Sequence, residues 1–210
     1  MDKSLEIGGE KGDYFARYKA SYVAGCLGPG FSGKVLDYGC GVGLLSACLL
    51  EHLPQASVHG YDVSAGSIAH VPYQIKQQGL FTSDIHQLRL EYDAVVVANV
   101  LHHVEPVERQ AVIHNLRDFM APGGKLIIFE HNPLNPLTRK VVRESPLDKG
   151  VVLLPAQETV SYLKSSDLKE IQLNYIVFFP KMLSALRWAE PLLRRLPLGA
   201  QYALQGSRKA

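Results

Sequence analysis

The stretch that most constrains the fold is Val35-Leu36-Asp37-Tyr38-Gly39-Cys40-Gly41-Val42-Gly43-Leu44. A short apolar run meets a turn with glycine at every second position, and the residues from Leu44 to Leu50 continue as the opening of a buried helix. Glycine lets the backbone turn tightly and approach a ligand, and a helix N-terminus offers unpaired N–H groups to polar or negative atoms. A strand, a glycine turn and a helix in this order predict a loop that binds a cofactor.

An acidic residue, Asp62, ends the next apolar segment, residues 57–61. A carboxylate at the tip of a second strand accepts hydrogen bonds from both hydroxyls of a ribose. The dinucleotide fingerprint G-x-G-x-x-G needs its third glycine where this chain has Leu44. An oxidoreductase that uses a nicotinamide cofactor is therefore the less favoured alternative.

These residues resemble a known family. Residues 35–43 together with Asp62 are similar to the first two motifs of the class I S-adenosylmethionine-dependent methyltransferases. The segment 99–104 resembles the fourth motif, and Pro-Gly-Gly at 122–124 before an apolar strand is another family hallmark. The resemblance covers about the first 130 residues and implies S-adenosylmethionine as cofactor. It also implies a Rossmann-like, doubly wound, mostly parallel seven-stranded sheet that ends in an antiparallel hairpin.

The rest of the chain agrees with an α/β fold, because strand and helix patterns alternate with short connections. Residues 92–99 predict a central strand, and a helix is expected from Ser64 to Gln78 with a kink or a late start at Pro72. Two Asn-Pro steps in residues 131–138 favour a shaped loop. Residues 173–179 and 201–206 are the candidate final hairpin.

We expect one domain. Residues 1–33 form its N-terminal helical cap, 34–130 its cofactor-binding core, and 131–210 its acceptor-side loop, helices and final hairpin.

The resemblance implies cofactor contacts from the leading helix and from the strand ends: Tyr14, Asp37, Gly39, Gly41, Gly43, Asp62, Val63, Asp84, Ile85 and Asn99. Two of these have ordinary alternatives. Tyr14 shares a helical spacing with Tyr18 and Tyr22, so the three also fit a packing stripe. Asp84 also fits a solvated turn.

The methyl group of S-adenosylmethionine is already activated by its sulfonium, so the protein mainly aligns the reactants by in-line geometry. A neutral hydroxyl or amine acceptor loses a proton near transfer, and a placed histidine then helps. His103, where the resembling family often has a histidine, and His131 are the candidate catalytic residues. The alternative for both is a purely structural role. No metal is expected, because adjacent His102 and His103 do not easily face one ion and no carboxylate spacing supports a site.

The acceptor is less defined. Residues 130–138 and 196–202 resemble a bacterial subgroup of small-molecule methyltransferases, including ones associated with glycan assembly, so a small-molecule or glycan-type acceptor and O- or N-methylation are favoured. A net charge of +2 argues against nucleic acid as partner. A non-catalytic sensor or partner protein with the same fold is the remaining alternative.

Residues 181–198 mix apolar side chains, arginines and one tryptophan. They suit a lid, a dimer contact or, less favoured, a contact with a membrane surface. The oligomeric state is left as monomer or homodimer. Three cysteines without metal spacing and an N-terminus without a signal-peptide core predict a cytoplasmic location.

Overall fold

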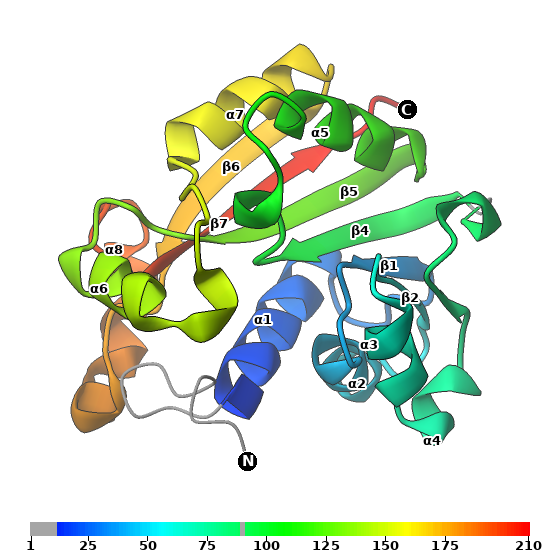
Figure 1. Ribbon diagram of the computed structural model, residues 1–210, viewed down its shortest axis with the longest axis horizontal. Coiled ribbons are helices and arrows are strands. Elements are labelled where there is room, and N and C mark those ends of the chain that lie inside the picture. The colour runs from blue at the N-terminus through cyan, green and yellow to red at the C-terminus, as the bar shows by residue number, and fades with distance from the viewer. Residues whose placement is uncertain (1–11, 89–90) are drawn as a thin grey trace.

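The computed structural model describes residues 12–88 and 91–210, and it is built on one seven-stranded sheet of order β3-β2-β1-β4-β5-β7-β6 (Figure 1). The first five strands pair in parallel, whereas β7 pairs antiparallel with both β5 and β6. The strands are β1 (Lys34–Tyr38), β2 (Ser57–Tyr61), β3 (Phe81–Thr82), β4 (Tyr92–Ala98), β5 (Met120–His131), β6 (Lys169–Ile176) and β7 (Gln201–Ser207). The predicted Rossmann-like sheet with a final antiparallel hairpin is confirmed.

Helices cover both faces of the sheet, and alternate residues of the central strands pack against the helices on opposite sides. Val95 and Val97 of β4 share one buried cluster with Ile113 of α5 (Arg109–Asp118) and Leu163 of α7 (Ala156–Ser165). Val96, between them, belongs to a second cluster with residues of α1 (Gly12–Leu27) and α2 (Leu44–His52). Figure 1 shows α5 and α7 on one side and α1 and α2 on the other.

The helix expected from Ser64 to Gln78 is interrupted at Pro72. It forms two short helices, α3 (Ala65–His70) and α4 (Tyr73–Lys76). Ser64 caps the first, since its Oγ accepts a hydrogen bond of 3.1 Å from the Ser67 N–H. Proline has no N–H to donate to the preceding turn, so the continuous helix is broken there.

The loop expected over residues 131–138 is shorter than predicted. Helix α6 (Pro136–Glu144) begins inside it, with Asn135 as its cap: Oδ1 accepts a 3.0 Å hydrogen bond from the Thr138 N–H. The second Asn-Pro step therefore starts a helix, because asparagine is a good N-cap and proline suits the first helical position.

The final hairpin is present with shifted bounds. Strand β6 begins at Lys169 and ends at Ile176, so the predicted strand over residues 173–179 runs too far. Val177 has a φ of 59°, which an extended strand does not allow, and this ends β6. Between β6 and β7 lie η5 (Lys181–Ala189) and α8 (Glu190–Leu193).

Three further 3₁₀ turns, η2 (Ile85–Gln87), η3 (Leu101–His103) and η4 (Pro146–Asp148), lie beside the sheet. Within residues 12–88 and 91–210, no helix has the length and apolar character needed to cross a bilayer. The N-terminal residues on which the signal-peptide argument rests lie outside the described part, and the division of the chain into one domain with three parts stays a prediction.

Candidate functional site

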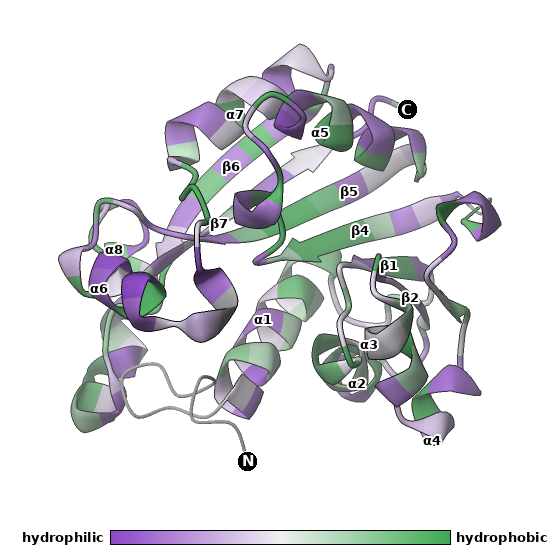
Figure 2. Ribbon diagram, in the orientation of Figure 1, coloured by the Kyte–Doolittle hydropathy of each residue, from purple (hydrophilic) through white to green (hydrophobic). Residues whose placement is uncertain are grey.

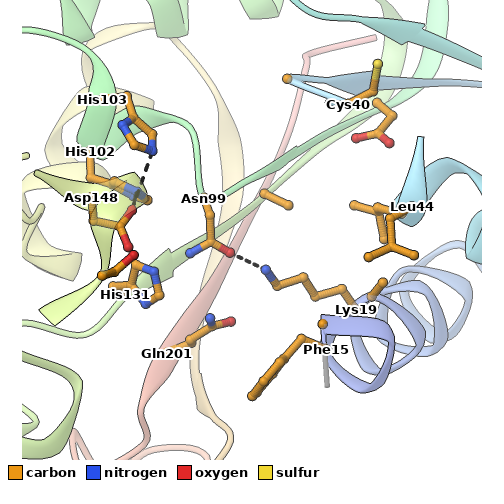
Figure 3. A pocket seen from close by; sticks show the side chains of 17 residues that line it. Phe15, Lys19, Cys40, Leu44, Asn99, His102, His103, His131, Asp148 and Gln201 are labelled. Carbon is orange, nitrogen blue, oxygen red and sulfur yellow. Dashed lines mark hydrogen bonds and ion pairs between the residues drawn. The ribbon is translucent and has the colours of Figure 1, made fainter. Parts of the chain in front are cut away.

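A cavity of about 330 Å³ lies at the carboxyl ends of the central strands (Figure 3). Open α/β sheets place their ligands at this edge. Its lining comes from every part of the chain: Gly12, Phe15, Ala16, Lys19, Asp37, Gly39, Cys40, Leu44, Leu45, Ala98, Asn99, His102, His103, His131, Ser145, Asp148 and Gln201.

The glycine turn has the backbone that the sequence predicts. Gly39, Gly41 and Gly43 have φ values of 80°, 54° and 82°, a region that side chains other than glycine rarely adopt. A Cβ on Gly39 would also lie 2.2 Å from Cγ2 of Val100. Gly39 lines the cavity, and Gly43 stands at the start of α2. The loop therefore presents bare backbone on its cavity side.

Asp62 ties the tip of β2 to this loop. Its Oδ2 accepts a 2.8 Å hydrogen bond from the Gly41 N–H, and its Oδ1 accepts one of 2.9 Å from the Ser64 N–H. Each carboxylate oxygen has a second lone pair, so Asp62 retains acceptor capacity for a ligand. In this structure Asp62 therefore holds the glycine turn in place.

Asp37, at the end of β1, is buried against the cavity. Its Oδ2 accepts a 2.6 Å hydrogen bond from Oγ of Ser46 on α2. Burial raises the pKa of Asp37 to about 6, while the Ser46 bond acts in the opposite direction. A cationic group bound beside it would offset that cost.

Lys19 reaches the same cavity from α1, and the sequence analysis missed it. The side chain is buried, and its Nζ donates to Oδ1 of Asn99 at the end of β4. Burial lowers the pKa of Lys19 to about 8, although Glu130 and Asp37 act against this shift. Asn99 itself has a φ of 59°, and its buried Nδ2 has no hydrogen-bond partner within residues 12–88 and 91–210. The pair therefore presents an ammonium group and an unsatisfied amide donor to the cavity (Figure 3).

The other wall of the cavity holds a buried acid–base cluster. Nδ1 of His102 lies 2.6 Å from Oε2 of Glu130, which is fully buried at the end of β5. Nε2 of His102 lies 3.5 Å from Oδ1 of Asp148. Burial alone would lower the pKa of His102, but the hydrogen bonds to Asp148 and Glu130 outweigh it and raise the pKa to about 9. His102 is thus an imidazolium held between two carboxylates.

His103 shares Asp148 with His102. Its Nε2 lies 3.7 Å from Oδ1 of Asp148, and the two imidazole rings, tilted by 44° to each other, have centroids 4.2 Å apart. Burial and the neighbouring His102 cation lower the pKa of His103 below its ordinary 6.5. The hydrogen bond with His102 lowers the pKa of Asp148 to about 2. His103 is therefore neutral at neutral pH, half-exposed, and next to an ionised carboxylate.

His131 and Gln201 complete this wall. Burial and the His102 cation lower the pKa of His131 to about 4, and its ring lies 5.2 Å from that of His102. Gln201, the first residue of β7, is buried, and its Oε1 accepts no hydrogen bond from the part of the chain that the structure describes. With Asn99 Nδ2, this gives the cavity one unsatisfied donor and one unsatisfied acceptor.

Seven residues expected at the cofactor are not part of the cavity lining: Tyr14, Gly41, Gly43, Asp62, Val63, Asp84 and Ile85. The ring of Tyr14 faces Arg187 instead of the cavity lining, with the guanidinium 4.3 Å from the ring centroid. Val63 is 81% exposed. Asp84 caps η2 by accepting a 3.0 Å hydrogen bond from the His86 N–H, and Ile85 packs against the core near Phe119. On α1, it is Phe15, Ala16 and Lys19 that face the cavity instead.

The geometric argument against a metal is wrong in one respect. The turn η3 does bring His102, His103 and Asp148 together, with ligand atoms within 4.8 Å of one another. The hydrogen bonds to Asp148 and Glu130 raise the pKa of His102 to about 9, however, so an ion would have to displace a proton from its ring. The absence of a metal stays a prediction.

Sequence patterns gave no signal for Asp148, which lies in a short turn between two helices far along the chain from η3. Lys19 was detectable in principle, because it lies among apolar residues on the buried face of α1. A charged residue on such a face is a candidate for a ligand contact.

Known proteins resemble parts of this chain. A family model described as "Methyltransferase domain" matches residues 36–126. The carboxy-S-adenosyl-L-methionine synthase of Aeromonas salmonicida is 30% identical over 121 residues, which are 50% of this chain and 48% of that protein. The ribosomal RNA small subunit methyltransferase C of Shewanella halifaxensis is 33% identical over 73 residues, which are 32% of this chain and 21% of that protein. The chain thus spans about half or less of the curated relatives it matches.

A solved structure of an S-adenosylmethionine-dependent methyltransferase from Archaeoglobus fulgidus has a TM-score of 0.68 and 16% identity, covering 91% of this chain and 94% of that one. At this identity the likeness shows the fold. Residues 36–126 thus match a methyltransferase domain, and the fold of the chain is the one found in S-adenosylmethionine-dependent methyltransferases.

Proposed function

We propose that the chain transfers a methyl group from S-adenosylmethionine to a hydroxyl or amine of a small polar acceptor by in-line displacement. One observation carries the proposal: a single cavity joins the glycine loop, Asp37 and Lys19 on one side with His103 and the Glu130–His102–Asp148 cluster on the other. A cofactor half and a proton-accepting half in one cavity are what such a transfer needs.

The residues present fit the cofactor. Its methionine part carries an ammonium and a carboxylate, and the cavity offers the buried Asp37 carboxylate and the Lys19 ammonium to match them. The unsatisfied Nδ2 of Asn99 supplies a further donor. When bound, the cofactor supplies a methyl group already activated by its sulfonium.

For the nucleoside part we retain the predicted contacts as proposals. The free lone pairs of Asp62 suit the ribose hydroxyls, and Gly39, Gly41 and Gly43 allow the backbone to approach the ligand. Val63, Asp84 and Ile85 follow the tips of β2 and β3, where the adenine would lie. The exposure of Asp84 weakens its part of the proposal.

We assign proton acceptance to His103. Its lowered pKa leaves the imidazole neutral at neutral pH, so Nε2 has a lone pair for the acceptor's proton. The imidazolium that forms would then lie 3.7 Å from the Asp148 carboxylate, which stabilises the new charge. His102 acts through Asp148, and Glu130 acts through His102, so both are positioning residues.

His131 has a different part in the proposal. A pKa of about 4 makes it a weak base, so it orients the acceptor by a hydrogen bond, together with Oε1 of Gln201. The cavity of about 330 Å³ has room for a small molecule or one sugar residue.

Other partners follow the same logic. The similarity to the ribosomal RNA enzyme covers 32% of this chain, and a nucleic-acid acceptor is not part of our proposal.

A cytoplasmic location is proposed, because Cys26, Cys40 and Cys48 are free thiols. A non-catalytic sensor remains the competing function. A nicotinamide-dependent enzyme is less favoured than the sensor, because Leu44 occupies the position of the third glycine.

Calorimetry tests the cofactor, with S-adenosylmethionine, S-adenosylhomocysteine and NADH titrated separately. We expect heat with the first two and none with NADH. A panel of small hydroxyl and amine compounds, with RNA as a separate arm, then tests turnover by release of S-adenosylhomocysteine. Binding without turnover on any acceptor would favour the sensor, and turnover on RNA alone would overturn the small acceptor.

A further inference from the structure

Two adjoining segments, residues 134–143 and 181–198, expose many apolar side chains. Seven of the fifteen large apolar residues that are exposed in the described chain lie in 181–198: Met182, Leu183, Leu186, Trp188, Leu192, Leu196 and Leu198. Met182 is 94% exposed and Trp188 75%. Scattered exposed apolar residues need no explanation, but a concentration of this kind indicates a binding surface.

The two segments are fixed side by side. Nδ2 of Asn135 donates a 2.7 Å hydrogen bond to the Leu198 carbonyl, and Nδ2 of Asn132 donates to the carbonyls of Pro197 and Gly199. Leu134 and Leu137, at the start of α6, are 64% and 55% exposed and extend the apolar area. We call residues 134–143 and 181–198 the apolar-basic surface. Figure 2 shows hydrophobic ribbon in the 181–189 part, at the lower left.

The exposed charges of this surface have one sign. Six basic side chains are exposed on it: Arg139, Lys140, Arg143, Lys181, Arg194 and Arg195. Its one acid, Glu190, is buried, where it accepts hydrogen bonds from the Tyr18 hydroxyl and from the Phe178 and Phe179 N–H groups. With Arg187 included, the surface holds seven basic residues and one acid, a formal charge of +6 in a chain of +2, so the remainder of the chain is at −4.

We propose that the apolar-basic surface docks on an anionic lipid bilayer as a peripheral contact. Lys and Arg draw such a surface to acidic headgroups, and exposed Leu, Met and Trp side chains enter the headgroup region. The charge argues against a second copy, because a two-fold contact would set the six basic side chains of each copy against those of the other. This inference does not rest on the proposed methyl transfer.

Trp188 is the chain's single tryptophan, so its fluorescence reports on this surface directly. We expect a blue shift and co-sedimentation with vesicles of phosphatidylcholine and phosphatidylglycerol, weaker binding at high salt, and much weaker binding to pure phosphatidylcholine. The full chain is used, and far-ultraviolet circular dichroism checks in parallel that each variant is folded.

The decisive variant is Arg194→Glu/Arg195→Glu. Each basic residue near an anionic surface contributes about fivefold to binding, so the loss of two should weaken it by roughly 30-fold or more. The matched control is Lys164→Glu/Lys169→Glu, which changes the net charge equally at the far end of β6 and should leave binding unchanged. For the apolar part, Leu192→Ser should weaken binding, whereas Val107→Ser, at a site 90% exposed, should not.

Three outcomes would overturn the proposal. They are no binding to the anionic vesicles, equal losses in the Arg194/Arg195 and Lys164/Lys169 variants, and a lipid-free dimer in sedimentation equilibrium that Leu192→Ser dissociates. The last would assign the surface to a second copy instead.

Discussion

Nδ1 of His102 lies 2.6 Å from Oε2 of Glu130, and Oε1 of the same carboxylate accepts a 2.7 Å hydrogen bond from the Leu101 N–H. The end of β5 thereby holds the turn η3, which carries both His102 and His103. Removing one partner of a buried ion pair is far more damaging than its net contribution suggests, since the other charge is left unpaired. The placement of His103 therefore depends on a residue that it does not touch.

The first prediction concerns pH and stability. The pKa of His102 rises from 6.5 in the unfolded chain to about 9 in the fold, so its stabilising contribution is complete below pH 6.5 and is lost as the pH rises through about 9. The shift corresponds to a contribution on the order of 3 kcal/mol. Glu130→Gln removes one of the two carboxylates, so the fall in the free energy of unfolding across this window should shrink. Urea titrations at several pH values measure the free energy of unfolding. An equal fall of this free energy with pH in both proteins would contradict the pairing of His102 with Glu130.

The second prediction concerns Lys19. Lys19→Met removes a charge-assisted contact worth about 1.5–3 kcal/mol, so the affinity for S-adenosylhomocysteine should fall roughly 10- to 150-fold. In the native protein the affinity should also fall as the pH rises through about 8, where Lys19 loses its proton. Calorimetry measures both effects. Lys34→Met, at an exposed position, is the control, and equal affinity in both variants would remove Lys19 from the cofactor site.

The third prediction compares two aspartates. Asp62→Ala should lose most of the cofactor affinity, because the ribose loses an ionised acceptor and the Gly41 N–H loses its partner. Asp84→Ala removes only the cap of η2 and the proposed adenine contact, so its loss should be several-fold smaller. Calorimetry ranks the two, and a reversed order would place the nucleoside over β3 instead of β2.

The fourth prediction concerns His103. His103→Ala should lower turnover by about 10²–10⁴-fold while cofactor affinity stays nearly unchanged. Because the active form is the neutral imidazole and its pKa is lowered, on the acid side the native rate at saturating cofactor should fall only at pH values below the ordinary histidine pKa of 6.5. His114→Ala, at an exposed site on α5, is the matched control. Turnover equal to that of the control would leave His103 a structural role alone.

The strands and the glycine loop were predictable because each depends on a local pattern. Val95, Val96 and Val97 form an unbroken β-branched run, and a strand covered on both faces needs no alternation. Gly39, Gly41 and Gly43 all have positive φ, which only their residue type makes easy.

What escaped prediction depends on contacts between distant segments. Asp148 meets His102 across more than forty residues of chain, and no spacing rule relates them. Asn135-Pro136 was ambiguous even locally, because an Asn-Pro step can belong to a loop or begin a helix. In the structure the Asn135 side chain accepts a hydrogen bond from the Thr138 N–H and so caps a helix. Tyr14 and Lys19 lie on one helix, and only the position of that helix over the sheet shows which of them faces the cavity.

The last strand of the chain lies inside the sheet, between β5 and β6. During synthesis β6 has no neighbour to join until residues 201–207 have left the ribosome, and until then β5 presents an open edge to other proteins. The same seven residues bring Gln201 to the cavity wall. A nascent or truncated chain that lacks them would have the glycine loop but not Gln201 at the cavity wall, so the proposed methyl transfer would have to wait until β7 has joined the sheet.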